Sequence, residues 1–226
     1  MINRLIHSLL ALLGATLIST AAAPSAFAAD DVLRLGVGLY QADKEKNDAT
    51  YRPLADYLAK QLGRPVKLYT VDTWEGLAKS LAAGETDIAL MGPWGYVLAN
   101  QVAGAQAVAS ILYDGKPEYF AIMVTHPKSG IRSIADLKGK TFAFGDKGST
   151  SGYLIPYHHF QKNGIDPETY LGRVINTKHQ AIEMQVTRGE LDAGADYNRN
   201  LDAMISEGLI KAQDSVVFWT SDPLPN

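Results

Sequence analysis

Short apolar runs alternate with amphipathic segments from the start of the folded part of the chain to about residue 102. The apolar runs show little polar alternation, which is typical of strands buried on both faces of a sheet. A parallel sheet with helices on its faces follows from this order, and such sheets bind ligands beyond the carboxyl ends of their strands. The pattern predicts strands at 32–37, 66–71 and 88–91, and helices at 50–62, 74–83 and 94–102.

The alternation of predicted strands and helices begins again after two further predicted strands, 107–112 and 119–125, and a turn-forming segment, His126 to Gly130. We therefore expect two α/β lobes with a ligand cleft between them. The second lobe has predicted strands at 141–144, 174–176, 193–196 and 216–219, and predicted helices at 153–163, 180–188 and 199–207. We assign a signal peptide to 1–28, lobe 1 to 29–125, lobe 2 to 126–220, and the start of a return crossing to lobe 1 to 221–226.

The first 28 residues have the three parts of a secretory signal peptide. Arg4 gives a positive start, Leu9 to Ile18 an apolar core, and Ala26-Phe27-Ala28 a small-x-small cleavage site. The apolar run is shorter than the roughly 20 residues that a membrane-spanning helix needs. We expect cleavage near Ala28/Ala29, export to the periplasm, and a mature protein that does not itself span the membrane.

Composition excludes several classes of function. Removing the predicted leader takes one of the 21 basic residues and none of the 24 acidic ones, which leaves a net charge of −4. A mildly acidic chain lacks the basic surface that nucleic-acid binding requires, so we predict no nucleic-acid partner. The chain has no cysteine, which excludes a disulfide framework and thiolate chemistry.

Three motifs that suggest catalysis or metal binding fail on inspection. Lys140-Thr141 follows Gly139 as in a nucleotide-binding loop, but the segment enters a strand rather than a helix. His158 and His159 are adjacent, so on a helix they point about 100° apart and cannot share a metal. A Ser149, His179, Asp192 triad lacks a nucleophile elbow. We predict no catalytic residues, no metal and no cofactor, and therefore a protein that is not an enzyme.

The strongest candidate for a binding site is the segment Gly145 to Gly152, which follows a predicted strand and opens a predicted helix. Its glycines allow tight turns, and Ser149, Thr150 and Ser151 place hydroxyl groups beside helix N–H groups that have no partner within the helix. A phosphate-like anion at this position would also meet the positive end of the helix dipole. The alternative is an ordinary helix cap, since serine and threonine cap many helices.

Four further residues lie at the ends of predicted strands: Trp74, His179 and Asp196 at or just after carboxyl ends, and Tyr119 at the start of the strand 119–125. Trp74 and Tyr119 would wall the cleft or pack in the core. His179 would donate to an oxyanion or cap a helix. Asp196 would accept a proton from a P–OH group, bind a substrate amine, or cap the next helix. Met91-Gly92-Pro93 would offer N–H donors after the proline or form a structural turn.

These segments, in their order along the chain, resemble the PhnD-like phosphonate/phosphite-binding proteins of ABC importers. The resemblance runs from about Val32 to the end, and its most specific parts are Ser149-Thr150-Ser151-Gly152 and Gly92-Pro93 with Tyr96-Val97. It is also carried by Leu35-Gly36-Val37, Thr73-Trp74-Glu75, Asp87-Ile88-Ala89, Ile134 to Lys140, His179 and Asp192 to Ala195.

The resemblance implies a type II periplasmic-binding fold that closes by hinge motion. It implies a phosphonate head bound by Ser149, Thr150 and Ser151, with aromatic and His179 contacts from both lobes. The partners would be a small phosphorus oxyanion and an ABC permease at the inner membrane. The family pattern has a tyrosine at Trp74 and a C-terminal segment that returns to the first lobe, so we expect this segment to be missing after Asn226.

The alternative function is the ligand-sensing module of a membrane receptor, a sensor kinase or cyclase whose signalling part would follow Asn226. For the transport protein, an aromatic wall of Trp74, Tyr119 and His179 would favour P–H or P–C over P–OH at the fourth substituent of phosphorus. We therefore expect phosphite or a small alkylphosphonate to bind better than phosphate.

Overall fold

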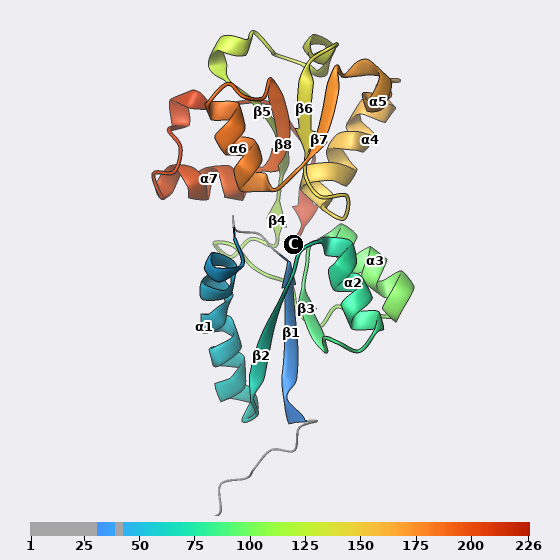
Figure 1. The fold of residues 1–226 in the computed structure, drawn as a ribbon, viewed down its shortest axis with the longest axis vertical. Helices are drawn as coiled ribbons and strands as arrows, with labels where there is room; N and C mark the ends of the chain where they lie inside the picture. Colours follow the sequence, from blue (N-terminus) through green and yellow to red (C-terminus); the bar gives the residue numbers. More distant parts are fainter. Residues whose placement is uncertain (1–30, 39–42) are drawn as a thin grey trace, which may run out of the picture.

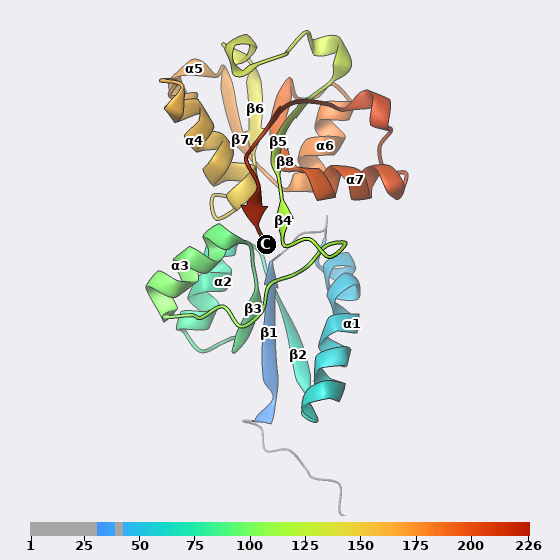
Figure 2. The ribbon, with the colours of Figure 1, turned by 180° about the vertical axis from the view of Figure 1, so that it is seen from behind.

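The computed structural model describes residues 31–38 and 43–226. Two α/β lobes lie one above the other and meet near strand β4 and the end of the chain (Figures 1 and 2). The predicted signal peptide lies outside the described residues, so its cleavage stays a prediction.

The first lobe contains a parallel sheet, as the sequence predicted, and its three strands lie in the order β2-β1-β3. Helix α1 lies on one side of this sheet, and α2 and α3 lie on the other (Figures 1 and 2). The core between them contains Leu35, Val37 and Ala55. The elements are β1 (Leu33–Gly38), α1 (Lys44–Leu62), β2 (Val66–Val71), α2 (Trp74–Ala82), β3 (Ile88–Leu90) and α3 (Pro93–Ala103).

Two predictions for this lobe were wrong. Helix α1 begins at Lys44 rather than at residue 50, because Asp43 caps it by accepting from the Lys46 N–H and its first turns are polar. The predicted strand 107–112 has no paired strand. Apolar composition alone does not make a strand, and without a partner Val108 and Leu112 stay 81% and 59% exposed.

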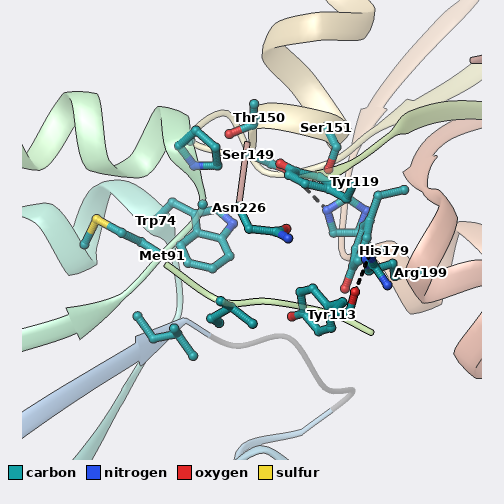
Figure 3. A pocket seen from close by; sticks show the side chains of 16 residues that line it. Trp74, Met91, Tyr113, Tyr119, Ser149, Thr150, Ser151, His179, Arg199 and Asn226 are labelled. Carbon is teal, nitrogen blue, oxygen red and sulfur yellow. Dashed lines mark hydrogen bonds between the residues drawn. The ribbon is translucent and has the colours of Figure 1, made fainter. Parts of the chain in front are cut away.

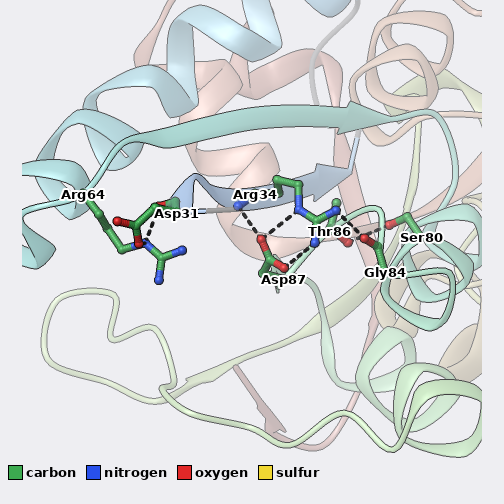
Figure 4. Close-up of polar contacts among 7 residues, drawn as sticks. All are labelled: Asp31, Arg34, Arg64, Ser80, Gly84, Thr86 and Asp87. Atoms are coloured by element: carbon green, nitrogen blue, oxygen red, sulfur yellow. Dashed lines mark hydrogen bonds and ion pairs between the residues drawn. The ribbon is translucent and has the colours of Figure 1, made fainter. Parts of the chain in front are cut away.

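A polar cluster ties the start of β3 to β1 (Figure 4). The Asp87 Oδ2 atom accepts from the Arg34 backbone N–H at 2.8 Å and from Arg34 Nε at 2.9 Å. The same guanidinium donates to the Gly84 carbonyl in the loop that follows α2. Behind it, the hydroxyls of Ser80 and Thr86 lie 2.8 Å apart. These contacts fix the α2–β3 loop at the end of the lobe away from the second lobe (Figures 1 and 4).

The second lobe contains a five-stranded mixed sheet in the order β7-β6-β8-β5-β9. Strand β5 is antiparallel to both of its neighbours, β8 and β9. Residues 121–125 therefore pair within the sheet of the second lobe, although the sequence analysis assigned them to lobe 1. The strands are β5 (Ala121–Thr125), β6 (Thr141–Phe144), β7 (Arg173–Asn176), β8 (Ala193–Tyr197) and β9 (Val216–Thr220).

Helical segments connect the strands of the second lobe, and its sheet is buried on both faces. On β6, Ala143 packs in one hydrophobic cluster while Phe142 and Phe144 pack in the other, because successive strand side chains point to opposite faces. The helical segments are η2 (Pro127–Ser129), η3 (Ile134–Leu137), η4 (Thr150–Leu154), α4 (Ile155–Lys162), α5 (Pro167–Tyr170), α6 (His179–Thr187), α7 (Asn198–Ser206) and η5 (Ala212–Asp214).

Two short strands lie between the lobes, β4 (Glu118–Tyr119) and β10 (Leu224–Pro225), and they pair in antiparallel fashion. Tyr119, Ala121 and Leu224 form a small core at this crossing. We propose that the lobes divide at β4 and β10, with residues 221–226 as the second crossing.

Candidate functional site

A cavity of about 90 Å³ lies where the two lobes meet, at the carboxyl ends of their strands (Figure 3). Six of the seven site residues predicted from the sequence line it: Trp74, Tyr119, Ser149, Thr150, Ser151 and His179. The other lining residues are Leu90, Met91, Gly92, Pro93, Ile111, Tyr113, Gly148, Tyr197, Arg199 and Asn226.

The three predicted hydroxyls stand at the start of a helix that begins three residues earlier than the sequence indicated. The helix opens with one π-helical turn, Thr150–Leu154, and continues into α4. Ser149 is its N-cap, and its Oγ accepts from the Gly152 N–H at 3.0 Å. The side chains of Ser149, Thr150 and Ser151 are all buried. The cap interpretation therefore holds for Ser149, although the residue also lines the cavity.

The N-terminus of α3 reaches the same position from the first lobe. Pro93 begins α3, and the Trp94 N–H donates to Thr150 Oγ1 at 2.8 Å. Met91-Gly92-Pro93 thus presents an N–H group to the cavity region, one of the two readings that the sequence left open. Two helix N-termini converge there, and each contributes partial positive charge and N–H groups without an intrahelical partner. This arrangement suits an anion.

Tyr119 places its hydroxyl group next to those of Thr150 and Ser151, which together with Ser149 form what we call the cradle. Burial raises the pKa of Tyr119, and hydrogen bonds from Thr150 and Ser151 partly oppose that rise. The ring is only 7% exposed and packs edge-on against Tyr197, with the ring centroids 6.0 Å apart. Tyr119 therefore serves both of the roles that the sequence left open, as core at the crossing and as a polar lining residue.

The lobes are in direct contact across the loop that precedes the cradle. The Trp74 N–H lies 3.4 Å from Asp146 Oδ1, and Trp94 Nε1 donates to the Lys147 carbonyl at 3.2 Å. Gly148 packs so closely that a Cβ atom there would lie 2.4 Å from the Cβ of Trp74. A glycine is required at this point for the lobes to meet, so the structure shows a closed arrangement.

His179 begins α6 and joins the cradle to a buried carboxylate. Its Nε2 lies 3.2 Å from Ser149 Oγ, and its Nδ1 lies 2.7 Å from Asp196 Oδ1. Asp196 is fully buried, does not line the cavity, and accepts from Asn200 Nδ2 at 2.8 Å. The Asp196 side chain therefore lies behind the imidazole and not at the cavity surface, and a direct contact between its carboxylate and a ligand stays a prediction.

Burial, more than mutual attraction, governs the charge of this pair. Burial lowers the pKa of His179 to about 4 and raises the pKa of Asp196 to about 7. The two atoms lie close together, but among the described residues neither His179 Nδ1 nor Asp196 Oδ1 has a hydrogen-bond partner of good geometry. At the other ring nitrogen, Nε2 donates to or accepts from the Ser149 hydroxyl, depending on the tautomer of His179.

Glu183, which the sequence analysis missed, completes this buried group. It lies one helical turn after His179 on α6, and Ser215 Oγ donates to its Oε2 at 3.1 Å. Burial raises the pKa of Glu183 to about 9, and the neighbouring Asp196 contributes to the rise. The available signal was the i, i+4 spacing from His179, which places both side chains on one helix face.

Tyr113, Tyr197 and Arg199 are further lining residues that sequence reasoning did not identify. The Tyr197 ring meets the His179 ring edge-on, with the centroids 4.9 Å apart. Arg199 stands at the start of α7, directly after β8, which is the position at which ligand-binding residues were expected. Tyr113 lies in a turn between the lobes, and its place in the cavity depends on the tertiary structure alone.

The sequence model for the ABC transporter phosphonate periplasmic substrate-binding protein family matches residues 39–226. The chain belongs to this phosphonate-binding family. Proteins of the family are periplasmic substrate-binding components of ABC transporters. No helix within residues 31–38 and 43–226 is long and apolar enough to cross a membrane.

Relatives within the phosphonate-binding family are similar over most of this chain. The phosphonates-binding periplasmic protein of Escherichia coli is 27% identical over 215 residues, covering 92% of this chain and 63% of the relative. The phosphate-import protein PhnD of Mycolicibacterium smegmatis is 29% identical over 187 residues, covering 77% of this chain and 58% of the relative. The chain thus spans about 60% of the length of these curated relatives.

A crystal structure from the same family shows the same fold. The binding protein component of an ABC phosphonate transporter from Pseudomonas aeruginosa superposes with a TM-score of 0.78 at 26% identity. The match covers 86% of this chain and 66% of the other. The fold is that of the type II periplasmic binding proteins, with two α/β lobes and the site between them, as the sequence predicted.

Proposed function

We propose that this protein captures a small phosphorus oxyanion, a phosphonate or phosphite in preference to phosphate, and delivers it to an ABC permease at the inner membrane. The observation that carries the proposal is the meeting of two helix N-termini, those of η4–α4 and α3, at a small cavity between the lobes. We further propose export to the periplasm after cleavage near Ala28/Ala29.

In this proposal the ligand binds with its oxygens toward Ser149, Thr150 and Ser151 at the start of the helix. Neutral donors and helix dipoles then bind the anion without a lysine or an arginine at the cradle itself. Trp74 comes from the first lobe and His179 from the second, so both lobes contact the same ligand. Binding would therefore favour the closed arrangement.

The names of the relatives support this choice of ligand class. The Escherichia coli relative is named for phosphonates and the Mycolicibacterium smegmatis relative for phosphate import. A binding protein needs recognition without turnover, and the buried cradle hydroxyls meet that need as hydrogen-bond donors.

Titration calorimetry on the purified mature protein tests the proposal with methylphosphonate, phosphite and phosphate. Methanesulfonate is the control ligand, because it has the tetrahedral shape and methyl group of methylphosphonate but carries one charge and no ionisable hydroxyl. We expect methylphosphonate and phosphite to bind at least about tenfold more tightly than methanesulfonate, since charge-assisted hydrogen bonds contribute about 1.5–3 kcal/mol each.

A variant pair locates the binding site. Thr150→Val removes the hydroxyl that accepts from Trp94 and should weaken methylphosphonate binding about fivefold or more. Thr169→Val makes the same chemical change at an exposed position at the far end of α4–α5 and should bind like the wild type. Equal binding by all three proteins would place the ligand elsewhere, and no binding of any phosphorus oxyanion would refute the function.

A further inference from the structure

Arg199 is the one Asp, Glu, Lys or Arg side chain among the described residues that line the cavity. It stands at the start of α7, beside Tyr113 (Figure 3). The neutral-donor cradle already accounts for the phosphorus oxyanion, so this cation is available for a different part of the ligand.

The present contacts of Arg199 leave its positive charge largely uncompensated. Its Nη2 donates to the Glu118 carbonyl at 3.1 Å and contacts the Tyr113 carbonyl at 3.4 Å, and neither partner is charged. The guanidinium also lies 4.5 Å from the centre of the Tyr113 ring. These contacts hold the side chain in place beside the cavity.

Two further observations indicate that the Arg199 guanidinium can bind an additional anion. Asp114 Oδ2 lies 3.8 Å from Arg199 Nη1, but the Asp114 side chain is 96% exposed, so water and salt screen this pair. The Nε atom of Arg199 is buried and has no hydrogen-bond partner among the described residues. An arginine with a free donor and a weakly paired charge binds carboxylates and phosphates well.

The same lining offers nothing to an ammonium group. Among the described residues no aspartate or glutamate lines the cavity, and Asp196 lies behind His179. An aminoalkyl substituent would bring a second positive charge toward Arg199 without a carboxylate to pair with.

We infer that Arg199 selects a phosphonate that carries a second anionic group, such as a carboxylate, over an aminoalkylphosphonate. This inference rests on the proposed function, because it assumes that the phosphorus group occupies the cradle. The phosphonate would bind at Ser149 to Ser151 and the carboxylate at Arg199.

Competition calorimetry on the purified mature protein tests this with phosphonoformate, phosphonoacetate, 3-phosphonopropionate, 2-aminoethylphosphonate and methylphosphonate. The first three ligands vary the distance between the two anionic groups. We expect at least one of them to bind about tenfold or more tightly than 2-aminoethylphosphonate, because one charge-assisted hydrogen bond gives a difference of that size. Methylphosphonate lacks a second charged group, so its binding tests the proposed function separately from ligand selection by Arg199.

Variants distinguish a role of Arg199 in ligand recognition from a purely structural role, that is, a brace that only holds the Glu118 and Tyr113 carbonyls in place. Arg199→Gln should lower the affinity for the carboxylate ligand by a larger factor than the affinity for methylphosphonate, and so remove the preference, and Arg199→Lys should keep part of the preference. Arg188→Gln removes the same charge at an exposed position in the same lobe and should keep the full preference. A brace alone predicts that Arg199→Gln weakens all ligands by the same factor, which would overturn the inference.

The wild-type result is decisive even if Arg199→Gln does not fold. If methylphosphonate binds but 2-aminoethylphosphonate binds as tightly as the best carboxylate ligand, the inference fails and the proposed function stands. If no phosphonate binds, the proposed function fails and the inference falls with it.

Discussion

Gly148 offers a test of whether the two lobes must meet for ligand to bind. A Cβ atom at this position would lie 2.4 Å from the Cβ of Trp74 and 3.2 Å from Asp146 Oδ1. Trp74 belongs to the first lobe and Gly148 to the second, so the overlap with Trp74 arises only when the lobes are together. The backbone of Gly148 is outside the left-handed region, so alanine fits the conformation of the loop itself.

The size of the effect follows from the contact distance. Carbon atoms pack at about 3.5–4.0 Å, so Gly148→Ala requires the lobes to separate by about 1 Å or more at this point. Inserting a methyl group into a well-packed contact typically costs about 1–3 kcal/mol. If that cost applies to the closed arrangement alone, ligand affinity should fall about 5- to 150-fold. The melting temperature without ligand should change little.

Calorimetry with methylphosphonate measures the affinity, thermal denaturation measures the stability, and small-angle scattering with and without ligand follows closure. For comparison, Gly92→Ala adds the same methyl group to the facing lobe, where its Cβ would lie at an ordinary 3.5 Å from Thr150 Oγ1. This change should not force the lobes apart, although it narrows the cavity that Gly92 lines. The reasoning is refuted if Gly148→Ala binds within about twofold of the wild type. A large drop in its melting temperature without ligand would instead show a folding defect.

The remaining predictions concern the cradle, the aromatic wall and the buried acid. Ser149→Ala should lower both affinity and stability, the latter by about 1 kcal/mol because the N-cap is lost, whereas Ser151→Ala should lower affinity alone; paired melting and binding measurements check this. Trp74→Ala should narrow the preference for methylphosphonate over phosphate in competition calorimetry. The change should be roughly 1–3 kcal/mol if a P–OH group against the ring lacks a hydrogen-bond partner. Unchanged selectivity would show that the Trp74 ring does not set the ligand preference. Glu183, with its pKa raised to about 9, holds a proton in the folded state that the unfolded chain releases above about pH 4.5, so stability should fall between these values by up to about 1.4 kcal/mol per pH unit. Glu183→Gln should remove that part of the slope in denaturation curves at pH 5 and pH 8, and an unchanged slope would contradict the assignment.

The local pattern of apolar and polar residues was sufficient to predict most of the helices and strands and several of the residues that line the cavity. The bounds of β2 and β6 agree with the apolar runs from which they were predicted. The cradle was identified because a glycine-flanked Ser-Thr-Ser segment between a strand and a helix has a local physical meaning, namely turn, cap and unpaired N–H groups. Position after a strand also identified Trp74 and His179, since parallel strands end at a common edge.

Which strands pair was decided by tertiary structure. The apolar run at 121–125 fits either lobe as a sequence, and only its hydrogen bonds with β8 and β9 assign it to the second sheet. The run at 107–112 is equally apolar, yet it has no paired strand and forms none. Strand formation depends on a partner that may lie 70 to 100 residues away, and a local pattern does not specify that partner.

The direction of side chains at the site was also decided by tertiary structure. Asp196 lies near the end of β8, but its side chain is fully buried and lies 2.7 Å from His179 Nδ1 instead of lining the cavity. Arg199 and Tyr113 are 86 residues apart, and they meet beside the cavity because α7 packs on the turn between the lobes. The sequence by itself therefore determined the fold class and the position of the cradle, because those depend on short-range periodicity and capping. The end of the cavity at which we propose that charge selects among ligands depends on long-range packing, and only the folded chain placed Arg199 there.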